Sequence, residues 1–281
     1  MTHKTKIIVE IASSHNGDMD LAKAMIKAAA SCGVDIVKFQ SWQAKNVSIK
    51  DPDRKRYEHL ELSDEDHFIL IKECQKYGVE FLTTCFDIGR IPFLKSLGLK
   101  RIKVPSVSLK ETKLLSELGK NFDHVIVSSG MSTAEEIINA IKILSDTSKE
   151  FTIMHCVAIY PTPLHKANLE KINWLKKFVP SVGYSDHTLG TEVPVVAMSM
   201  GIDFLEKHFT LSRHLPQETH TTAVGGKAIT THQIAAEPHE IFEICRWRDL
   251  IQKTKGSLRL KMYSDEIKTR KKYTGRLGQN S

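Results

Sequence analysis

Long apolar runs are absent from this sequence. No stretch approaches the roughly 18 consecutive apolar residues that a membrane-spanning helix requires. The first residues, MTHKTKIIVEIASSHNG, enter a short apolar run directly and lack the layout of a secretory signal peptide. We therefore expect a cytoplasmic protein with no membrane partner.

Cysteine is scarce and shows no pattern. The five residues are Cys32, Cys74, Cys85, Cys156 and Cys245, and no CxxC pair occurs. An odd number without paired spacing implies neither a disulfide framework nor a zinc finger. Free thiols agree with a reducing cytoplasm.

Linker-like segments rich in proline, glycine or serine are also missing, and the first expected loop has no GxGxxG fingerprint of a dinucleotide fold. Hydrophobic residues make up 41% and charged residues 26% of the 281 residues, which is ordinary usage for a packed domain.

The net charge of +7 comes largely from lysines and arginines between residues 253 and 276. Such a run is usually a solvated face or a mobile end, so we expect no nucleic-acid partner.

Short β-branched runs alternate with amphipathic stretches along the chain. The expected strands span residues 7–11, 34–40, 80–84, 101–104, 124–128, 151–156, 182–185 and 203–208. The expected helices span residues 18–30, 64–77, 89–97, 109–118, 134–144, 169–178, 192–200 and 231–251. Eight such units without hairpins imply parallel strands joined by helical crossovers. We therefore predict an α/β fold, a single TIM (β/α)8 barrel, with functional groups at the C-terminal ends of its strands.

Two histidines fall at neighbouring strand ends of this barrel. His187 follows the seventh expected strand, in GYSDHT, and His208 ends the eighth, in FLEKHFT. Adjacent strands lie about 4.8 Å apart, so both imidazoles can share one metal ion that keeps open positions for water and substrate. Manganese, zinc, iron and cobalt all suit imidazole. On spacing alone, a hydrogen-bonded pair of rim histidines is an equal alternative.

Charged residues of both signs point to an anion site at the same rim. Lys38 and Lys103 end the second and fourth strands, and two lysines at one mouth repel unless an anion such as phosphate or carboxylate separates them. Glu10 lies inside the apolar strand IIVEIA, next to the eighth strand once the barrel closes; its structural alternative is a salt bridge to one of these lysines. Hydroxyl groups at or after strands four, five and seven would complete an oxyanion cradle: Ser106, Ser128 and Ser185.

Three further polar residues have less definite roles. His15 follows the first strand and His155 ends the sixth, and either can orient its neighbours. Asp186, beside His187, is a candidate to support that imidazole from behind.

Several motifs follow one another between Ile7 and His208: EIASSHNG, VKFQ, FLTTCFD, SSGM, HCVAIYPTP, GYSDHT and LEKHFT. In content, order and spacing they resemble segments of the sialic acid synthases, the N-acetylneuraminate synthase family. The pair HC-x-x-x-YPTP and SDHT is highly specific. The resemblance covers most of the barrel domain of that family.

The resemblance implies a transferase that condenses phosphoenolpyruvate with an N-acetylated amino sugar or a related aldehyde. The product is a 2-keto acid, and phosphate is released. It also implies a homodimer and a divalent metal, usually manganese, with magnesium, cobalt or zinc as alternatives, held by His187 and His208. The family's contacts to phosphoenolpyruvate match Lys38, Lys103, Ser106, Ser128 and Ser185. Its glutamate that contacts the sugar matches Glu10, and further active-site positions match Gln40, Thr84 and Tyr160.

The chain departs from the family pattern in three places. Ser108 stands where the family has a glutamate, and Ala158 where it has an asparagine. The segment LPQETHTTAV lacks an expected sugar-binding aspartate, which Glu218 or His220 would replace. We also expect no antifreeze-like domain, so residues 1–257 form the barrel and residues 258–281 a basic extension. The acceptor is therefore expected to be altered and is not identified by the sequence.

Two other functions stay open at this point. One is a metal-dependent aldolase or lyase on the same barrel, which would release no phosphate. The other is a degenerate barrel that binds a ligand without catalysis, which the changes at Ser108 and Ala158 favour. The presence of Glu10, both lysines and both histidines at one rim favours an enzyme.

Overall fold

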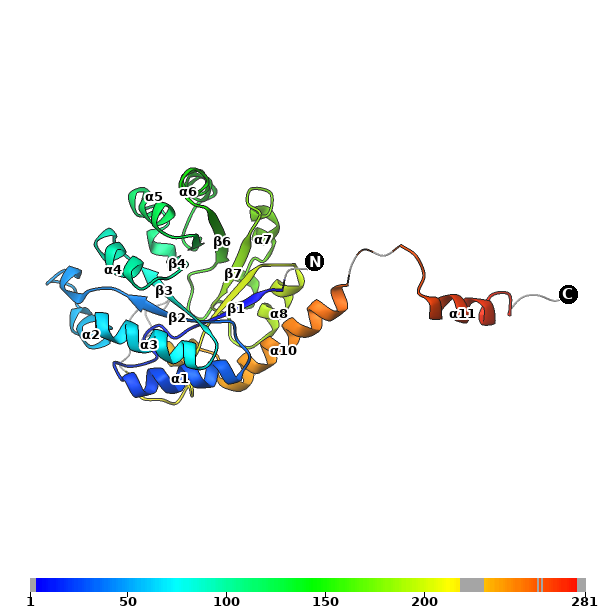
Figure 1. The fold of residues 1–281 in the computed structure, drawn as a ribbon, viewed down its shortest axis with the longest axis horizontal. Helices are drawn as coiled ribbons and strands as arrows, with labels where there is room; N and C mark the ends of the chain where they lie inside the picture. Colours follow the sequence, from blue (N-terminus) through cyan, green and yellow to red (C-terminus); the bar gives the residue numbers. More distant parts are fainter. Residues whose placement is uncertain (1–3, 218–229, 257, 259, 277–281) are drawn as a thin grey trace.

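The protein folds into a closed barrel of eight parallel strands, each hydrogen-bonded to the next and the last to the first (Figure 1). The computed structural model describes residues 4–217, 230–256, 258 and 260–276. The strands are β1 (Lys6–Glu10), β2 (Ile36–Ser41), β3 (Glu80–Cys85), β4 (Arg101–Val104), β5 (His124–Ser128), β6 (Glu150–Cys156), β7 (Val182–Asp186) and β8 (Phe204–His208). The predicted TIM barrel is confirmed.

Helices lie outside the barrel, and all but the last, α11, surround it. They are α1 (Met19–Ser31), α2 (Arg54–Leu60), α3 (Asp64–Lys76), α4 (Ile91–Ser96), α5 (Thr112–Asn121), α6 (Ala134–Thr147), α7 (Glu170–Leu175), α8 (Glu192–Ser199), α9 (Thr231–Ile234), α10 (Pro238–Lys255) and α11 (Ser264–Tyr273). Several begin at the side-chain caps that short polar residues provide. Ser63 and Thr133 each form a reciprocal capping box, with Asp66 and Glu136.

The single helix predicted over residues 231–251 is wrong. The structure breaks it into α9 and α10, because Ala235 has an extended backbone conformation (ψ 150°) and Pro238 starts the second helix. Between the two helices, the Ala236 amide donates to the His208 carbonyl at 2.8 Å, and its carbonyl accepts from the Thr210 amide at 3.0 Å. The break therefore ties the chain to the end of β8, directly at His208.

Two helices were not predicted. The short α2 lies in the connection from β2 to α3, and its residues Arg56, Tyr57 and Leu60 line the cavity described below. The basic α11 has no buried residue and lies away from the barrel in Figure 1. The division into a barrel of residues 1–257 and an extension of residues 258–281 stays a prediction. In the part of the chain that is described, no helix is long and apolar enough to cross a membrane.

Side chains inside the barrel form three layers along its axis. The middle layer is apolar and forms its own cluster of buried residues, separate from the larger core between strands and helices. Its members are Ile8, Ile36, Leu82, Ile126, Met154 and Phe204. Because residues two apart on a strand share a face, the neighbours of this layer toward the C-terminal end are Glu10, Lys38, Thr84, Ser128, Cys156 and Glu206. The apolar layer is thus the floor beneath a charged upper layer.

Candidate active site at the C-terminal end of the barrel

A cavity of about 840 Å³ opens at the C-terminal end of the strands. Every predicted site residue within the described part of the chain lines it: Glu10, Lys38, Gln40, Thr84, Lys103, Ser106, Ser128, Tyr160, Ser185, His187 and His208. Glu218 and His220 lie outside the described residues. The sequence prediction that these scattered residues meet at one rim agrees with this geometry, whereas their individual roles stay predictions.

The Lys38 ammonium group is buried and held on two sides. It forms an ion pair with Glu10 and donates a 3.1 Å hydrogen bond to the Thr84 hydroxyl. Burial, together with the charge of Lys103, lowers the pKa of Lys38 to about 7, although Glu206 opposes the shift. The salt bridge between Glu10 and Lys38, considered as the structural alternative, is therefore present. The second oxygen of Glu10 accepts a 2.7 Å hydrogen bond from the Ala12 amide, which fixes the carboxylate in place.

Lys103 lies across the cavity floor from Lys38, and Glu206 separates the two ammonium groups. The Glu206 carboxylate is 3.5 Å from the Lys38 nitrogen and 3.6 Å from the Lys103 nitrogen. Burial alone would raise its pKa, but Lys103 and Lys38 hold it at about 2, so Glu206 is an anion at neutral pH. The anion expected between the lysines is thus partly supplied by the protein itself.

Sequence analysis missed Glu206. The signal was available, because Glu206 lies two residues before His208 in LEKHF and must share its inward face. One of the Glu206 oxygens, Oε2, accepts no hydrogen bond of normal geometry among the described residues, and the Lys38 ammonium lies 3.5 Å from it. Because that contact is long, this oxygen can also accept a hydrogen bond from a ligand in the cavity.

The three expected serines line the cavity, and each forms a hydrogen bond to another group of the protein. Ser128 accepts a 2.6 Å hydrogen bond from Lys103, and Ser185 donates one of 3.1 Å to Glu206, so both fix charged groups of the protein. Ser106 accepts a 3.0 Å hydrogen bond from the Gly130 amide at the cavity wall. A Cβ atom at Gly130 would lie 2.8 Å from the Ser106 oxygen, so this wall has no room for a larger residue.

The two histidines stand next to each other above β7 and β8. Their ring centroids are 5.4 Å apart with an angle of 39° between the planes, and the Tyr160 ring lies 4.2 Å from His187. The Nδ1 atom of His187 donates to the Val157 carbonyl at 2.8 Å, which leaves Nε2 as the ligating atom. Nδ1 of His208 is buried without a hydrogen-bond partner among the described residues. Burial and the neighbouring His187 keep the pKa of His208 well below its usual value, so its ring is neutral.

These features fit a metal ion held by His187 and His208. Neutral imidazole is the ligating form, which His208 has, whereas at His187 the effect of burial is outweighed by Cys156, which raises the pKa of that ring. Metal–nitrogen bonds of about 2.1 Å from two rings suit the observed separation of the centroids. No group of three or more histidine, cysteine or acidic residues with metal-ligand geometry occurs in the described part of the chain. A metal here would therefore complete its coordination with water or substrate.

Some neighbouring residues do not have the positions expected of them. Asp186 makes no hydrogen bond to His187; its carboxylate accepts from Tyr184, Thr188 and Lys207 instead. His155 donates to the Ala167 carbonyl outside the cavity, as an orienting residue would. Ser108 is buried but does not line the cavity, whereas Ala158 does. Ser108 therefore lies behind the cavity wall.

The model of the NeuB family matches residues 25–243. The chain is 36% identical to the uncharacterized protein MJ1065 of Methanocaldococcus jannaschii, covering 90% of this chain and 72% of that one. It is 34% identical to the N,N'-diacetyllegionaminic acid synthase of Campylobacter jejuni, covering 90% and 78%. It superposes on the N-acetylneuraminic acid (sialic acid) synthetase of Leptospira borgpetersenii with a TM-score of 0.85 at 29% identity, covering 97% of this chain and 93% of that one. The predicted resemblance is confirmed, and this chain belongs to the NeuB family.

Proposed function

We propose that this protein condenses phosphoenolpyruvate with the open-chain aldehyde of an N-acetylated amino sugar, forming a 2-keto acid and releasing phosphate. One observation carries the proposal: two buried lysines and two histidines meet in a single cavity of about 840 Å³. The lysines suit a substrate with a phosphate and a carboxylate. The histidines suit a metal ion that would bind the carbonyl oxygen of the second substrate.

The lysines would bind phosphoenolpyruvate through its two anionic groups. Lys38 and Lys103 are each directed into the cavity by a hydroxyl group, that of Thr84 and that of Ser128. Cations buried in this way interact strongly with an anion because little water screens them. Glu206 lies between them and would keep the lysines apart, so that one ammonium group faces each end of the substrate.

A divalent metal, manganese in the first instance, would be held by His187 and His208. When bound, it would supply Lewis-acid polarisation of the aldehyde oxygen. Glu10 would accept a hydrogen bond from a hydroxyl group of the sugar, because its carboxylate is fixed at the edge of the cavity by Ala12 and Lys38. The Tyr160 ring would pack beside the reacting groups and exclude water from that side.

The bond changes balance without a further reactant except water. The C3 carbon of phosphoenolpyruvate bonds to the aldehyde carbon, whose oxygen becomes an alkoxide, and positive charge develops at C2. Water adds at C2, and one of its protons goes to the alkoxide. The resulting tetrahedral centre expels phosphate, which takes the second proton of the water, and the 2-keto group remains. Lys38 and Lys103 would stabilise the phosphate and carboxylate charges throughout these steps. Glu206, beside them, would accept a hydrogen bond from a donor group of the ligand.

The acceptor class rests on the relatives. Those with assigned names include synthases of N,N'-diacetyllegionaminic acid, N-acetylneuraminate 9-phosphate and pseudaminic acid. These names favour an N-acetylated amino sugar for this chain as well. The residue expected to bind the sugar, Glu218, lies outside the described residues, and the aldolase and ligand-binding alternatives differ from the proposal in releasing no phosphate.

The proposal is tested by measuring phosphate release from phosphoenolpyruvate. The full chain, stripped of metal and reloaded with manganese, would be given a panel of N-acetylated amino sugars and simple aldehydes, and the product identified by mass spectrometry. His208→Ala should remove activity, whereas His239→Ala, an exposed histidine on α10, should keep it. If no aldehyde causes phosphate release with any of manganese, magnesium, cobalt or zinc, the condensing function is wrong.

A further inference from the structure

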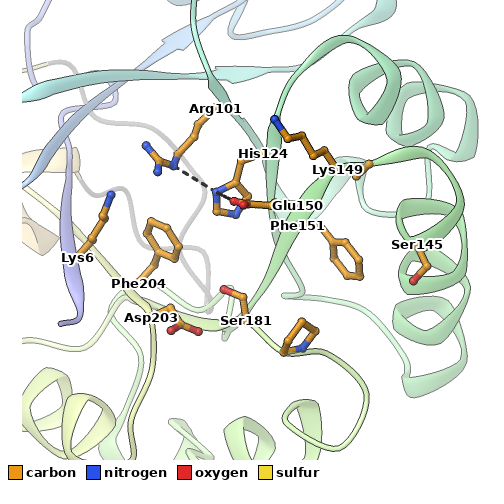
Figure 2. Close-up of a pocket in the computed structure, with 12 residues that line it drawn as sticks. Lys6, Arg101, His124, Ser145, Lys149, Glu150, Phe151, Ser181, Asp203 and Phe204 are labelled. Carbon is orange, nitrogen blue, oxygen red and sulfur yellow. Dashed lines mark hydrogen bonds and ion pairs between the residues drawn. The ribbon is translucent and has the colours of Figure 1, made fainter. Parts of the chain in front are cut away.

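A second cavity lies at the opposite, N-terminal end of the barrel. Its volume is about 540 Å³, and it is lined by residues at the starts of the strands, among them Lys6, Arg101, His124 and Phe204. Figure 2 shows these side chains around the opening, with Ser181 and Asp203 below them. The apolar middle layer of the barrel separates this cavity from the candidate active site, because Ile8, Ile126 and Phe204 fill the axis between the two. It is therefore a distinct site.

A chain of hydrogen bonds in this cavity has a fixed direction. The Arg101 Nε atom donates to Nδ1 of His124 at 3.2 Å (Figure 2). Arginine can only donate, so the proton of the neutral ring is on Nε2, which then donates to the Thr152 hydroxyl at 2.8 Å. Thr152 is fully buried, and its own proton goes to the Ser181 oxygen at 2.7 Å. The Ser181 hydroxyl is left as a donor that faces the cavity it lines.

Two cations line the same cavity as this hydroxyl donor, Lys6 and Arg101. Arg101 uses one terminal nitrogen, Nη1, for both oxygens of Glu80, at 2.7 and 2.6 Å, which leaves Nη2 without a hydrogen bond to the described residues. Lys6 forms no ion pair with a carboxylate of the described part of the chain. Burial lowers the pKa of His124 to about 4, and the charges of Arg101 and Lys6 add to the shift, so the ring is neutral.

Two carboxylates also line the cavity, and one of them, Glu150, lies close to His124. Asp203 uses one oxygen to accept from the Val182 amide at 3.0 Å. Glu150 is largely exposed, with one oxygen 3.9 Å from His124. The donors that remain, a guanidinium nitrogen, an ammonium group and a hydroxyl, match the acceptor oxygens of a small oxyanion.

We propose that the N-terminal mouth of the barrel is an oxyanion-binding site in which Lys6, Arg101 and Ser181 hold a phosphate or a carboxylate group. The site takes its ligand from solvent and is independent of the proposed condensation. Free phosphate and small dicarboxylates both present such an oxyanion. Titration with each ligand alone distinguishes the two.

The test follows the NMR signals of the carbon-bound ring protons of His124. These signals are assigned because they disappear in His124→Gln. Titration of the full-length protein with inorganic phosphate, and separately with succinate, should shift these signals to saturation. Lys6→Met should weaken the response about tenfold, the change that about 1.4 kcal/mol produces. Ser181→Ala, which removes the hydroxyl donor without a charge, should also weaken it. Lys149→Met is the matched control, because this exposed lysine borders the same cavity but pairs with Asp123 at 3.5 Å.

Phosphate can also enter the upper cavity, so the titration is repeated with Lys103→Met. The His124 response should be unchanged there if the two sites are distinct. The proposal is overturned if neither anion moves the His124 signals, or if the response is equal in Lys6→Met and the wild type. It is equally overturned if the response disappears in Lys103→Met.

Discussion

The carboxylate of Asp186 accepts a 2.6 Å hydrogen bond from the ammonium group of Lys207, and both side chains are buried. The pair joins the last residue of β7 to the strand residue before His208. It thereby fixes the spacing of the two strand ends that carry the histidines. The same Lys207 donates to the Thr188 carbonyl at 2.7 Å, which holds the loop that follows His187.

Removing the lysine of this pair should destabilise the protein strongly. In Lys207→Met the buried Asp186 keeps its charge without a counter-ion, and we expect a loss of about 3–5 kcal/mol in the free energy of unfolding. Urea denaturation measures this loss. The double variant with Asp186→Asn should recover part of it, since no buried charge remains unpaired. Equal losses in the single and double variants would show that the ion pair is not the cause.

Neutralising Glu206 should change anion binding rather than the fold. In Glu206→Gln, Lys38 loses a carboxylate that raises its pKa, so less of it is charged at pH 7 and phosphoenolpyruvate should bind about tenfold more weakly, or roughly 1.4 kcal/mol. Isothermal titration calorimetry with phosphoenolpyruvate gives the dissociation constant. Glu117→Gln, which removes a carboxylate paired with Lys120 on the surface of α5, is the control and should leave it unchanged. Tighter binding in Glu206→Gln would mean that this carboxylate mainly repels the substrate.

The metal prediction has a readout that does not require activity. If His187 and His208 bind manganese, adding the ion to metal-free protein should raise the melting temperature, because a ligand that binds only the folded state stabilises it. The shift should be absent in His208→Ala and retained in His239→Ala. An undiminished shift in His208→Ala would place the ion elsewhere.

Acid should destabilise the protein through its buried neutral histidines. The pKa of His124 is about 4 when folded and near 6.5 when unfolded, so the unfolded chain binds more protons between these values. The contribution of His124 to the free energy of unfolding is roughly 3 kcal/mol. It is complete above pH 6.5 and is lost as the pH falls through about 4. His124→Gln can keep the hydrogen bonds but does not titrate. Its unfolding free energy should therefore fall less steeply with acid than that of the wild type, as measured by denaturation at a series of pH values. Parallel pH profiles would contradict this assignment.

Much of the barrel could be predicted because its local patterns agree with its global form. Apolar runs separated by amphipathic stretches give the strands, and His187 and His208 could be placed at one rim because parallel strands end on the same side. The interruption of the last helix was missed although Pro238 marked it. The backbone bonding between Ala236 and the end of β8 is a tertiary contact that no local pattern records.

The pairings within the site were harder to predict than its membership. The sequence places Lys38, Lys103 and Glu10 on one rim, but which acid meets which lysine depends on the stagger of the strands around the barrel. The structure pairs Glu10 with Lys38 and puts Glu206 between both lysines. The hydrogen-bond chain from Arg101 to Ser181 joins the starts of β4, β5 and β6 to the residue before β7, and no sequence motif indicated it.

The six residues of the apolar middle layer have hydrocarbon or thioether side chains, and none of these groups can pass a proton on. A change of protonation at one mouth of the barrel is therefore not relayed to the other mouth by these side chains.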